Sequence, residues 1–215
     1  MEEKRLQVTE IFYSIQGEST HAGRLCIFIR LTGCPLRCRY CDTAYAYSGG
    51  NSMSVEEIFS KVKSFDCSLV EVTGGEPLLQ QNTIHLLNNL LQDNYEVLLE
   101  TSGAVEISSV PDGVKRIVDF KCPDSGESKH NLFHIIDDLR AGDEVKFVIA
   151  SKNDYEWTRS VVSRYPRLGG FPLLLSPAVP NLSTKMLAEW MLEDNFPARL
   201  QIQLHKIVGL DERIG

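Results

Sequence analysis

Short apolar runs alternate with amphipathic segments along most of the chain, a pattern typical of repeated strand–helix units. Residues 25–31, with the sequence LCIFIRL, predict a buried strand. Later apolar runs predict strands at residues 69–72, 96–100, 116–121, 144–150, 173–175 and 199–204. Apolar side chains at helical spacing predict helices near residues 82–92, 132–139, 155–164 and 183–192.

A further helix is predicted to begin after Ser54, because Ser54 and Glu57 have the spacing of a capping box. Together these elements make about six β/α units, fewer than the eight of a full barrel. We therefore expect an α/β fold in the form of a partial, open (β/α)6-type barrel. It is expected to be a single domain over residues 1–215.

Glycine and polar residues directly follow several predicted strands. These strand ends are Gly33-Cys34, Thr73-Gly74-Gly75-Glu76, Thr101-Ser102-Gly103, Lys121 and Ser176-Pro177. In parallel α/β architectures, ligands bind at the carboxyl ends of the strands. We therefore expect one functional site to gather at that edge of the sheet.

Composition narrows the possible classes of protein. Of the 215 residues, 43% are hydrophobic and 24% are charged, which is ordinary for a globular domain. The formal charge of −7, without a run of lysine and arginine, argues against a nucleic-acid footprint. The chain starts without the apolar stretch of a signal peptide, and no segment approaches the roughly 20 apolar residues of a membrane span. A cytoplasmic location is expected.

Three of the six cysteines, Cys34, Cys38 and Cys41, form a C-x3-C-x2-C segment. Thiolates are the usual protein ligands of iron–sulfur clusters. Three of them bind three irons of a 4Fe–4S cluster and leave the fourth iron open, as catalytic metal sites do. Structural zinc is the alternative, and it needs a fourth ligand such as His21. The scattered thiols are expected to be ordinary core residues: Cys26, Cys67 and Cys122.

This cysteine segment resembles the radical SAM superfamily, whose members bind S-adenosylmethionine (SAM) at the open iron. An aromatic residue before the third cysteine is usual in that superfamily, and Tyr40 matches it. The turn Gly74-Gly75-Glu76-Pro77 resembles the superfamily's SAM-binding turn. Glycines let the backbone approach a ligand closely, and a carboxylate or a backbone carbonyl accepts from an ammonium group.

A second resemblance, to the 7-carboxy-7-deazaguanine synthases, covers nearly the whole chain. It is strongest in residues 10–18 (EIFYSIQGE), although the family has glycine where this chain has Ser19. The other matching segments are residues 28–34 (FIRLTGC), 41–43 (CDT), 100–103 (ETSG) and 203–206 (QLHK). Residues 119–123 (DFKCP) match more loosely, because the family varies there.

The resemblance implies conversion of 6-carboxy-5,6,7,8-tetrahydropterin to 7-carboxy-7-deazaguanine in queuosine and 7-deazapurine biosynthesis. In that family the reduced cluster cleaves SAM, and the 5′-deoxyadenosyl radical takes a hydrogen from the pterin. The ring then contracts and ammonia leaves. The resemblance further implies Mg²⁺ ligated by Thr43, an electron donor such as flavodoxin or ferredoxin, and a homodimer.

Roles for individual residues follow from the same resemblance. Residues 8–20 would form a substrate-binding segment and residues 33–44 the cluster loop. Substrate contacts are implied for Ile15, Gln16, Gly17, Glu18, Arg30, Thr73, His205 and Gly215. SAM contacts are implied for Tyr40, Cys41, Asp42, Gly75, Glu76, Asp119, Phe120, Lys121 and Ser176.

Side-chain chemistry agrees with several of these roles and leaves alternatives. Gln16 and Glu18 offer the donors and acceptors that a pterin edge needs, or they are solvated turn residues. Arg30 interrupts an apolar strand and therefore needs an anion. That anion is the substrate carboxylate, bound in bidentate fashion, or an internal partner such as Glu18 or Glu76.

Four other assignments also have a structural alternative. Asp42 is equally suited to cap a helix or to ligate a metal. Lys121 is placed to neutralise the SAM carboxylate and Ser176 to hydrogen-bond SAM, but both suit ordinary strand ends. His205 by itself is more often a structural histidine than a ligand-binding one.

Two other functions compete with this interpretation. A glycyl-radical activase would share the radical SAM core, but it must admit a protein loop rather than enclose a pterin. A non-catalytic iron–sulfur or zinc module would need neither the Gly-Gly-Glu turn nor Arg30. Formation of 5′-deoxyadenosine from SAM and a reductant separates the enzymes from the module.

Overall fold

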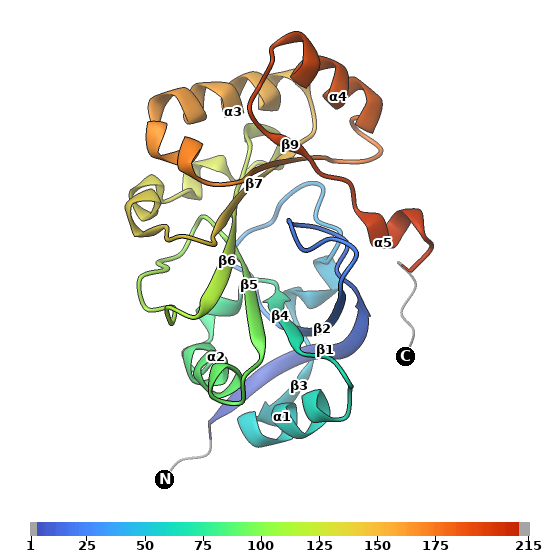
Figure 1. Ribbon diagram of the computed structural model, residues 1–215, viewed down its shortest axis with the longest axis vertical. Helices are drawn as coiled ribbons and strands as arrows, with labels where there is room; N and C mark the ends of the chain where they lie inside the picture. Colours follow the sequence, from blue (N-terminus) through green and yellow to red (C-terminus); the bar gives the residue numbers. More distant parts are fainter. Residues whose placement is uncertain (1–3, 211–215) are drawn as a thin grey trace.

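One open sheet organises residues 4–210, the part of the chain that the computed structural model describes. Its nine strands within that range have the order β3-β1-β2-β4-β5-β6-β7-β8-β9 (Figure 1). They are β1 Arg5–Ile15, β2 Leu25–Leu31, β3 Asn51–Ser54, β4 Leu69–Gly74, β5 Glu96–Ser102, β6 Val114–Phe120, β7 Glu144–Ile149, β8 Leu173–Pro177 and β9 Arg199–Leu200. The helices are α1 Val55–Lys63, α2 Thr83–Gln92, α3 Lys152–Arg164, α4 Thr184–Glu193 and α5 Leu204–Ile207.

Strand direction fixes where the site lies. β2 and the strands from β4 to β9 are parallel, whereas β1 pairs antiparallel with both β2 and β3. Within residues 4–210, β9 pairs only with β8, so the sheet stays open as predicted. Figure 1 shows α1 and α2 at one end of the sheet, α3 and α4 at the other, and α5 apart from both pairs.

The β1–β2 connection, residues 16–24, crosses the amino ends of the parallel strands. The Thr20 amide donates to Glu144 Oε2 (3.0 Å) at the start of β7. Arg24 Nη2 donates to Glu96 Oε2 (2.6 Å) at the start of β5. This connection therefore closes one end of the space beside the sheet, and the strand-end loops close the other.

The two faces of the sheet bury different residues, because side chains alternate along each strand. The outer face packs against the helices in the main apolar core, which contains Ile29, Val72 and Val118. The opposite face, here called the inner face, holds a small apolar cluster: Cys26, Phe28, Leu69, Leu98 and Ile117. Beyond this cluster the inner-face positions become polar: Arg30, Glu71, Thr73, Glu100, Asp119 and Lys146.

The predicted capping box is confirmed. The Glu57 amide donates to Ser54 Oγ (3.1 Å), and the Ser54 amide donates to Glu57 Oε2 (2.6 Å). Two unpaired amides at the start of α1 are thereby satisfied. The buried positions Val55, Ile58 and Val62 then face the sheet.

Several element predictions need correction. The strand predicted at residues 199–204 is wrong beyond Leu200, because the following glutamine side chains bond to residues near the chain's start and α5 follows. The helix predicted at residues 132–139 is a 3₁₀ segment, Phe133–Asp138. The apolar pattern does not predict β1 or β3. No helix within residues 4–210 is long and apolar enough to cross a membrane.

Candidate active site

The three clustered cysteines lie on the loop that follows β2 at the carboxyl edge of the sheet. Gly33 has a φ of 99°, and its amide donates to the Ala46 carbonyl (2.8 Å), which turns the chain out of the strand. The Cys41 amide donates to the Cys38 carbonyl (3.2 Å). All three thiols belong to half-buried residues. The loop therefore presents its thiols at the surface of the site rather than in the core.

The chemistry of these thiols fits a 4Fe–4S cluster. Burial raises the pKa of Cys34 and of Cys38, the latter to about 11, while the Lys121 ammonium opposes the rise. The three thiols lie close enough to interact electrostatically. Within residues 4–210, no three His, Cys, Asp or Glu side chains converge as a single metal ion requires. A cubane needs no such convergence, because each thiolate takes a different iron.

The Gly74-Gly75-Glu76 turn after β4 lies directly against the cysteine loop. The Gly75 amide donates to the Leu31 carbonyl (3.1 Å), and the Glu76 amide donates to the Gly33 carbonyl (2.7 Å). A Cβ on Gly75 would lie 2.1 Å from the Gly33 oxygen and 2.9 Å from Cys34 Cβ. Glycine is required here because two backbones touch. Contact of this turn with SAM stays a prediction.

The Glu76 carboxylate has a structural role, which corrects the prediction for its side chain. It is fully buried and accepts from Ser102 Oγ (2.7 Å), the Ser102 amide (2.7 Å), Thr101 Oγ1 (2.9 Å) and the Leu78 amide (3.0 Å). A carboxylate with four donors is not available to the SAM ammonium. The backbone carbonyls of the turn are left as the acceptors.

Asp119, at the end of β6, carries an unsatisfied acceptor. Its Oδ2 accepts from Lys121 Nζ (2.8 Å), but its buried Oδ1 has no hydrogen-bond partner within residues 4–210. A buried acceptor without a donor is destabilising, so this atom points to a ligand with an N–H or O–H group. Burial by itself would lower the pKa of Lys121, but the charge of the Asp119 carboxylate outweighs this effect and raises the pKa. The pair fits SAM, which carries both donor groups and a carboxylate.

The remaining predicted SAM contacts stay predictions, and their side chains have the following positions. The Phe120 side chain belongs to the outer core, where it stacks on Phe133 with ring centroids 5.5 Å apart. Only the backbone of Phe120 is therefore left for a ligand on the inner face. The Tyr40 hydroxyl donates to the Val148 carbonyl (3.1 Å) and fastens the cysteine loop to β7. Ser176 pairs with Val148 in the sheet and is buried.

Thr43 and Asp42 lie beside the third cysteine. Thr43 Oγ1 is 3.6 Å from Cys41 Sγ. Asp42 accepts from Lys206 Nζ (2.8 Å) and from Gln203 Nε2 (3.1 Å). Burial alone would raise the pKa of Asp42, but the hydrogen bond and charge of Lys206 outweigh it and lower the pKa to about 2. Asp42 is thus committed to the C-terminal residues, while Thr43 keeps a neutral oxygen near the thiols.

Arg30 has an internal partner that the sequence did not predict. Its Nε donates to Glu10 Oε1 (2.7 Å) on the neighbouring strand, rather than to Glu18 or Glu76. The guanidinium also lies over the rings of Phe12 and Tyr45, 5.8 Å and 5.9 Å from their centroids. The bond occupies Nε alone, so the two Nη groups can still form a fork for a carboxylate.

A chain of charged hydrogen bonds crosses the inner face. Lys146 Nζ donates to Glu18 and to Glu100 Oε1 (2.7 Å). Thr73 Oγ1 donates to Glu100 Oε2 (3.1 Å). Two predicted substrate residues, Glu18 and Thr73, are therefore joined through two residues that the sequence analysis did not single out.

A second buried carboxyl group adjoins this chain. Gln16 Nε2 donates to Glu71 Oε2 on β4, and both residues are buried. Burial, reinforced by the charges of Glu100 and Glu18, raises the pKa of Glu71 well above its ordinary value. The inner face thus combines the carboxyl groups of Glu18, Glu71 and Glu100 with the amide of Gln16.

Residues 201–206, here called the C-terminal strap, complete the wall beside Glu18. Gln203 Nε2 donates to Glu18 Oε1 (2.8 Å). The Leu204 amide donates to the Gly17 carbonyl (2.9 Å). The His205 ring lies so close to Gly17 that a Cβ there would be 1.9 Å from His205 Nδ1. Burial lowers the pKa of His205, so its imidazole is neutral at pH 7. The predicted contact at Gly215 lies outside the described residues.

The residues that sequence reasoning missed share one signal. Glu71, Glu100 and Lys146 each interrupt an otherwise apolar strand at an inner-face position, as Arg30 does. A charge inside a buried strand is costly unless it is paired, so each of them marks a polar cavity or an internal ion pair. Like Arg30, each of these three residues therefore needs a partner of opposite charge or a polar ligand.

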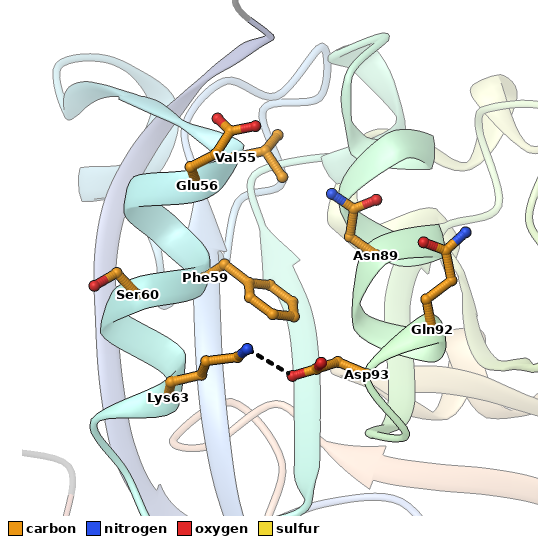
Figure 2. A pocket seen from close by; sticks show the side chains of 8 residues that line it. All are labelled: Val55, Glu56, Phe59, Ser60, Lys63, Asn89, Gln92 and Asp93. Atoms are coloured by element: carbon orange, nitrogen blue, oxygen red, sulfur yellow. Dashed lines mark ion pairs between the residues drawn. The ribbon is translucent and has the colours of Figure 1, made fainter.

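A groove between α1 and α2 lies outside this site. Figure 2 shows Phe59 within it and the Lys63–Asp93 ion pair across it, with Nζ and Oδ2 3.1 Å apart. Its lining contains neither a cysteine nor any predicted site residue. The chemistry gathers instead at the carboxyl edge of the sheet.

Comparison with known proteins agrees with this geometry. The model of the Radical SAM superfamily matches residues 28–172. A 7-carboxy-7-deazaguanine synthase of Chlorobaculum tepidum is 45% identical over 96% of this chain and 95% of its own length. The enzyme of the same name from Koribacter versatilis is 40% identical over 98% of this chain and its whole length. The crystal structure of QueE from Escherichia coli has the same fold, with a TM-score of 0.78 at 22% identity over 94% of this chain and 95% of that one.

Proposed function

The chain belongs to the radical SAM superfamily and, within it, to the 7-carboxy-7-deazaguanine synthase family, and from this membership we propose its reaction. It converts 6-carboxy-5,6,7,8-tetrahydropterin to 7-carboxy-7-deazaguanine with loss of ammonia. The observation that carries the proposal is the polar inner face. It brings Gln16, Glu18, Arg30 and Thr73 into one space next to the three cysteines.

Residues at the carboxyl edge are proposed to hold the cofactors. Cys34, Cys38 and Cys41 would ligate a 4Fe–4S cluster, which supplies the electron that cleaves SAM. Lys121 donates to the SAM carboxylate, and the unpaired Oδ1 of Asp119 accepts from a SAM hydroxyl or ammonium group. Backbone atoms of Gly75 and Phe120, together with Ser176 and Tyr40, would line the same cavity.

The proposed substrate-binding residues divide by chemistry. The segment at residues 8–20 brings Gln16 and Glu18 to the N–H-rich edge of the pterin, where a carboxylate and an amide accept and donate. Arg30 takes the substrate carboxylate with its Nη fork. His205 lies against Gly17 and closes the pocket from the C-terminal side.

Four finer points belong to the same proposal. Thr43 provides a hard oxygen ligand for Mg²⁺ beside the cluster loop. A flavodoxin or ferredoxin is proposed as the electron donor, and a homodimer as the assembly. A cytoplasmic location is proposed because three reduced thiolates are stable in a reducing compartment.

The test is a product assay. The protein is reconstituted with iron and sulfide without oxygen, reduced, and given SAM, Mg²⁺ and 6-carboxytetrahydropterin. Formation of 7-carboxy-7-deazaguanine, followed by mass spectrometry, is the expected result. Formation of 5′-deoxyadenosine without that product would keep the radical chemistry and reject the pterin.

The matched control separates the cluster from the fold. Cys38→Ala removes one proposed ligand and is expected to lose both the iron and the product. Cys67→Ala removes a half-buried thiol outside the loop and should retain both. Full iron content in the Cys38 variant would contradict the ligand assignment.

A further inference from the structure

Lys146 occupies an unusual position for a lysine. It lies in the middle of β7, on the inner face, with 6% of the residue exposed. Lysine is almost never buried without a partner. Its ammonium contacts two carboxylates that come from separate parts of the chain, Glu18 of the β1–β2 connection and Glu100 of β5.

Both carboxylates are also held from a second side. Glu100 Oε2 accepts from Thr73 Oγ1 (3.1 Å). Glu18 accepts from Gln201 Nε2 (3.0 Å) and from Gln203 Nε2 (2.8 Å). Because Lys146 is the contact that they share, it fixes the position of one carboxylate relative to the other.

The protonation states follow the same arrangement. Burial by itself would raise the pKa of Glu100, but the charge and hydrogen bond of Lys146 outweigh this effect and lower the pKa. Glu71 faces the same space without contacting Lys146, and burial raises its pKa well above the ordinary value. Of these two carboxyl groups, the one that contacts the ammonium therefore has a lowered pKa, and the one that does not has a raised pKa.

The other charged groups that face this cluster are compensated. Arg30 of β2 pairs with Glu10, and Lys121 pairs with Asp119 of β6. His205 of the strap interacts with Glu18 and Lys146, and burial lowers its pKa, so it contributes no charge at pH 7. The other two charged groups that act on His205, Asp42 and Lys206, form an ion pair with each other. Lys146 is thus the cation on which the inner carboxylates depend.

We infer that Lys146 is a positioning residue that fixes Glu18 and Glu100 as the two acceptors for the N–H groups of the substrate ring. The inference rests on the proposed function, since it takes the pterin as the ligand. A carboxylate accepts hydrogen bonds at both oxygens, whereas a protonated carboxyl turns one oxygen into a donor. Without Lys146, only the charge of Lys121 and the hydrogen bond of Thr73 oppose the effect of burial on the pKa of Glu100. A Glu100 side chain that takes up a proton would meet the ring's N–H groups donor to donor.

The experiment compares Lys146→Met and Lys146→Arg with the wild-type enzyme. Each protein is reconstituted with its cluster and loaded with SAM without oxygen. Equilibrium binding of 6-carboxytetrahydropterin is measured before reduction, and kcat and KM are measured from pH 6 to pH 9 after reduction. Lys63→Met serves as the control, because it removes a lysine–carboxylate pair in the α1–α2 groove (Figure 2).

We expect Lys146→Met to raise Kd and KM by about tenfold to a hundredfold, the loss of charge-assisted hydrogen bonds. The acid limb of its kcat/KM profile should move up by about one pH unit, because the essential carboxylate becomes harder to ionise. Lys146→Arg should restore both, and Lys63→Met should match the wild type. 5′-Deoxyadenosine formed without substrate should stay within about twofold in all of them, since SAM contacts are unaltered.

Three results would overturn the inference. Unchanged substrate affinity and acid limb in Lys146→Met would show that the carboxylates do not depend on the ammonium. Equal losses in Lys146→Met and Lys146→Arg would show that shape, not charge, is what matters. If the wild type cleaves SAM but makes no 7-carboxy-7-deazaguanine, the proposed function fails and the inference falls with it. Should Lys146→Met not fold, Lys146→Gln keeps an N–H donor without the charge, and the same shifts are expected.

Discussion

At the scale of single residues, the face of the strand decides what a buried charge does. Arg116 of β6 is fully buried on the outer face, where it pairs with Asp143 and donates to the carbonyls of Ile107 (3.1 Å) and Asp138 (2.7 Å). All these partners of Arg116 lie in segments that connect strands of the protein itself, so Arg116 stabilises those segments. Lys146, one strand away on the inner face, holds two carboxylates, Glu18 and Glu100, that are proposed to bind the substrate. Burial alone therefore does not identify a functional residue.

Arg30→Gln tests the carboxylate fork at this scale. The change removes the cation but keeps a polar side chain, so SAM cleavage without substrate should persist. Pterin affinity should fall by about tenfold to a hundredfold, as expected for a lost charge-assisted bidentate contact. Binding of the pterin to the SAM-loaded protein measures the effect.

The control for Arg30 is Arg159→Gln, which breaks an exposed pair with Glu156 on α3. It should bind the pterin like the wild type. Unchanged affinity in the Arg30 variant would leave Arg30 with internal partners only, namely Glu10 and the rings of Phe12 and Tyr45, and remove it from the proposed substrate site.

At the scale of elements, the site depends on backbone contacts between loops that follow different strands. The turn after β4 donates two amides to the chain that leaves β2. The β1–β2 connection bonds to the starts of β5 and β7. Each contact joins segments that are far apart in sequence. The positions of the loops therefore depend on the sheet, because it brings these segments together.

Gly75→Ala tests the contact between the turn and the cysteine loop. A methyl group would overlap the Gly33 carbonyl and Cys34 Cβ, so one loop must move. We expect lower iron content after reconstitution and a loss of about 2 kcal/mol in the free energy of unfolding. Iron analysis and urea titration measure the two effects.

Gly169→Ala is the matched control, because a Cβ there meets no atom within 4 Å. It should retain iron and stability. A Gly75 variant with full iron content would mean that the two loops separate without disturbing the thiols.

Glu96→Gln tests how the β1–β2 connection is held. Hydrogen bonds from Arg24 and Lys115, against a small effect of burial, lower the pKa of Glu96 to about 2. The pKa is lower in the folded state, so this stabilisation is complete above about pH 4.3, the ordinary value of a glutamate. It is lost as the pH falls from there to about 2.

The measurement is urea unfolding of both proteins from pH 7 to pH 3. At pH 7 the variant should be less stable by about 1 kcal/mol, a value discounted for solvent screening. The difference should narrow on acidification. A difference in stability that widens toward pH 3 would contradict this prediction.

Sequence patterns predicted the elements whose burial follows from a contiguous apolar run. β2 has its predicted bounds, because its apolar run is buried on both faces. The conformation of residues 201–206 was not predicted, because it depends on long-range hydrogen bonds such as the one from the Ser19 amide to Gln201 Oε1 (2.8 Å). In the site, the motifs named the cysteines and Asp119, but the side-chain directions of Glu76 and Phe120 depend on partners that only the fold brings close.

At the scale of the whole molecule, the C-terminal strap substitutes for the strands that a closed barrel would have. β9 contributes two exposed residues at the edge of the sheet. Beyond it, Gln203 bridges Glu18 and Asp42, and Lys206 holds Asp42 (2.8 Å). The proposed substrate site is therefore bounded on this side by side-chain hydrogen bonds rather than by a backbone ladder.

Lys206→Ala tests how firmly the strap is held. The ion pair is exposed, so the global free energy of unfolding should change by less than about 1 kcal/mol. Local opening should become easier, and amide hydrogens of residues 201–208 should exchange about threefold to tenfold faster. Hydrogen exchange followed by mass spectrometry measures this, with the exposed Lys185→Ala as control. Equal exchange rates in both variants would assign the strap's position to its glutamines.

The strap follows the other residues of the proposed site in chain order, which has a consequence for protein synthesis. A ribosome releases the cysteine loop and the strands up to β8 before it adds Gln201, Gln203 and His205. A nascent chain therefore acquires its thiols and the residues proposed to face SAM, Asp119 and Lys121, before the two glutamines that hold Glu18 from the strap. A product that stopped before the strap would carry the proposed cluster and SAM ligands without that wall of the proposed substrate site.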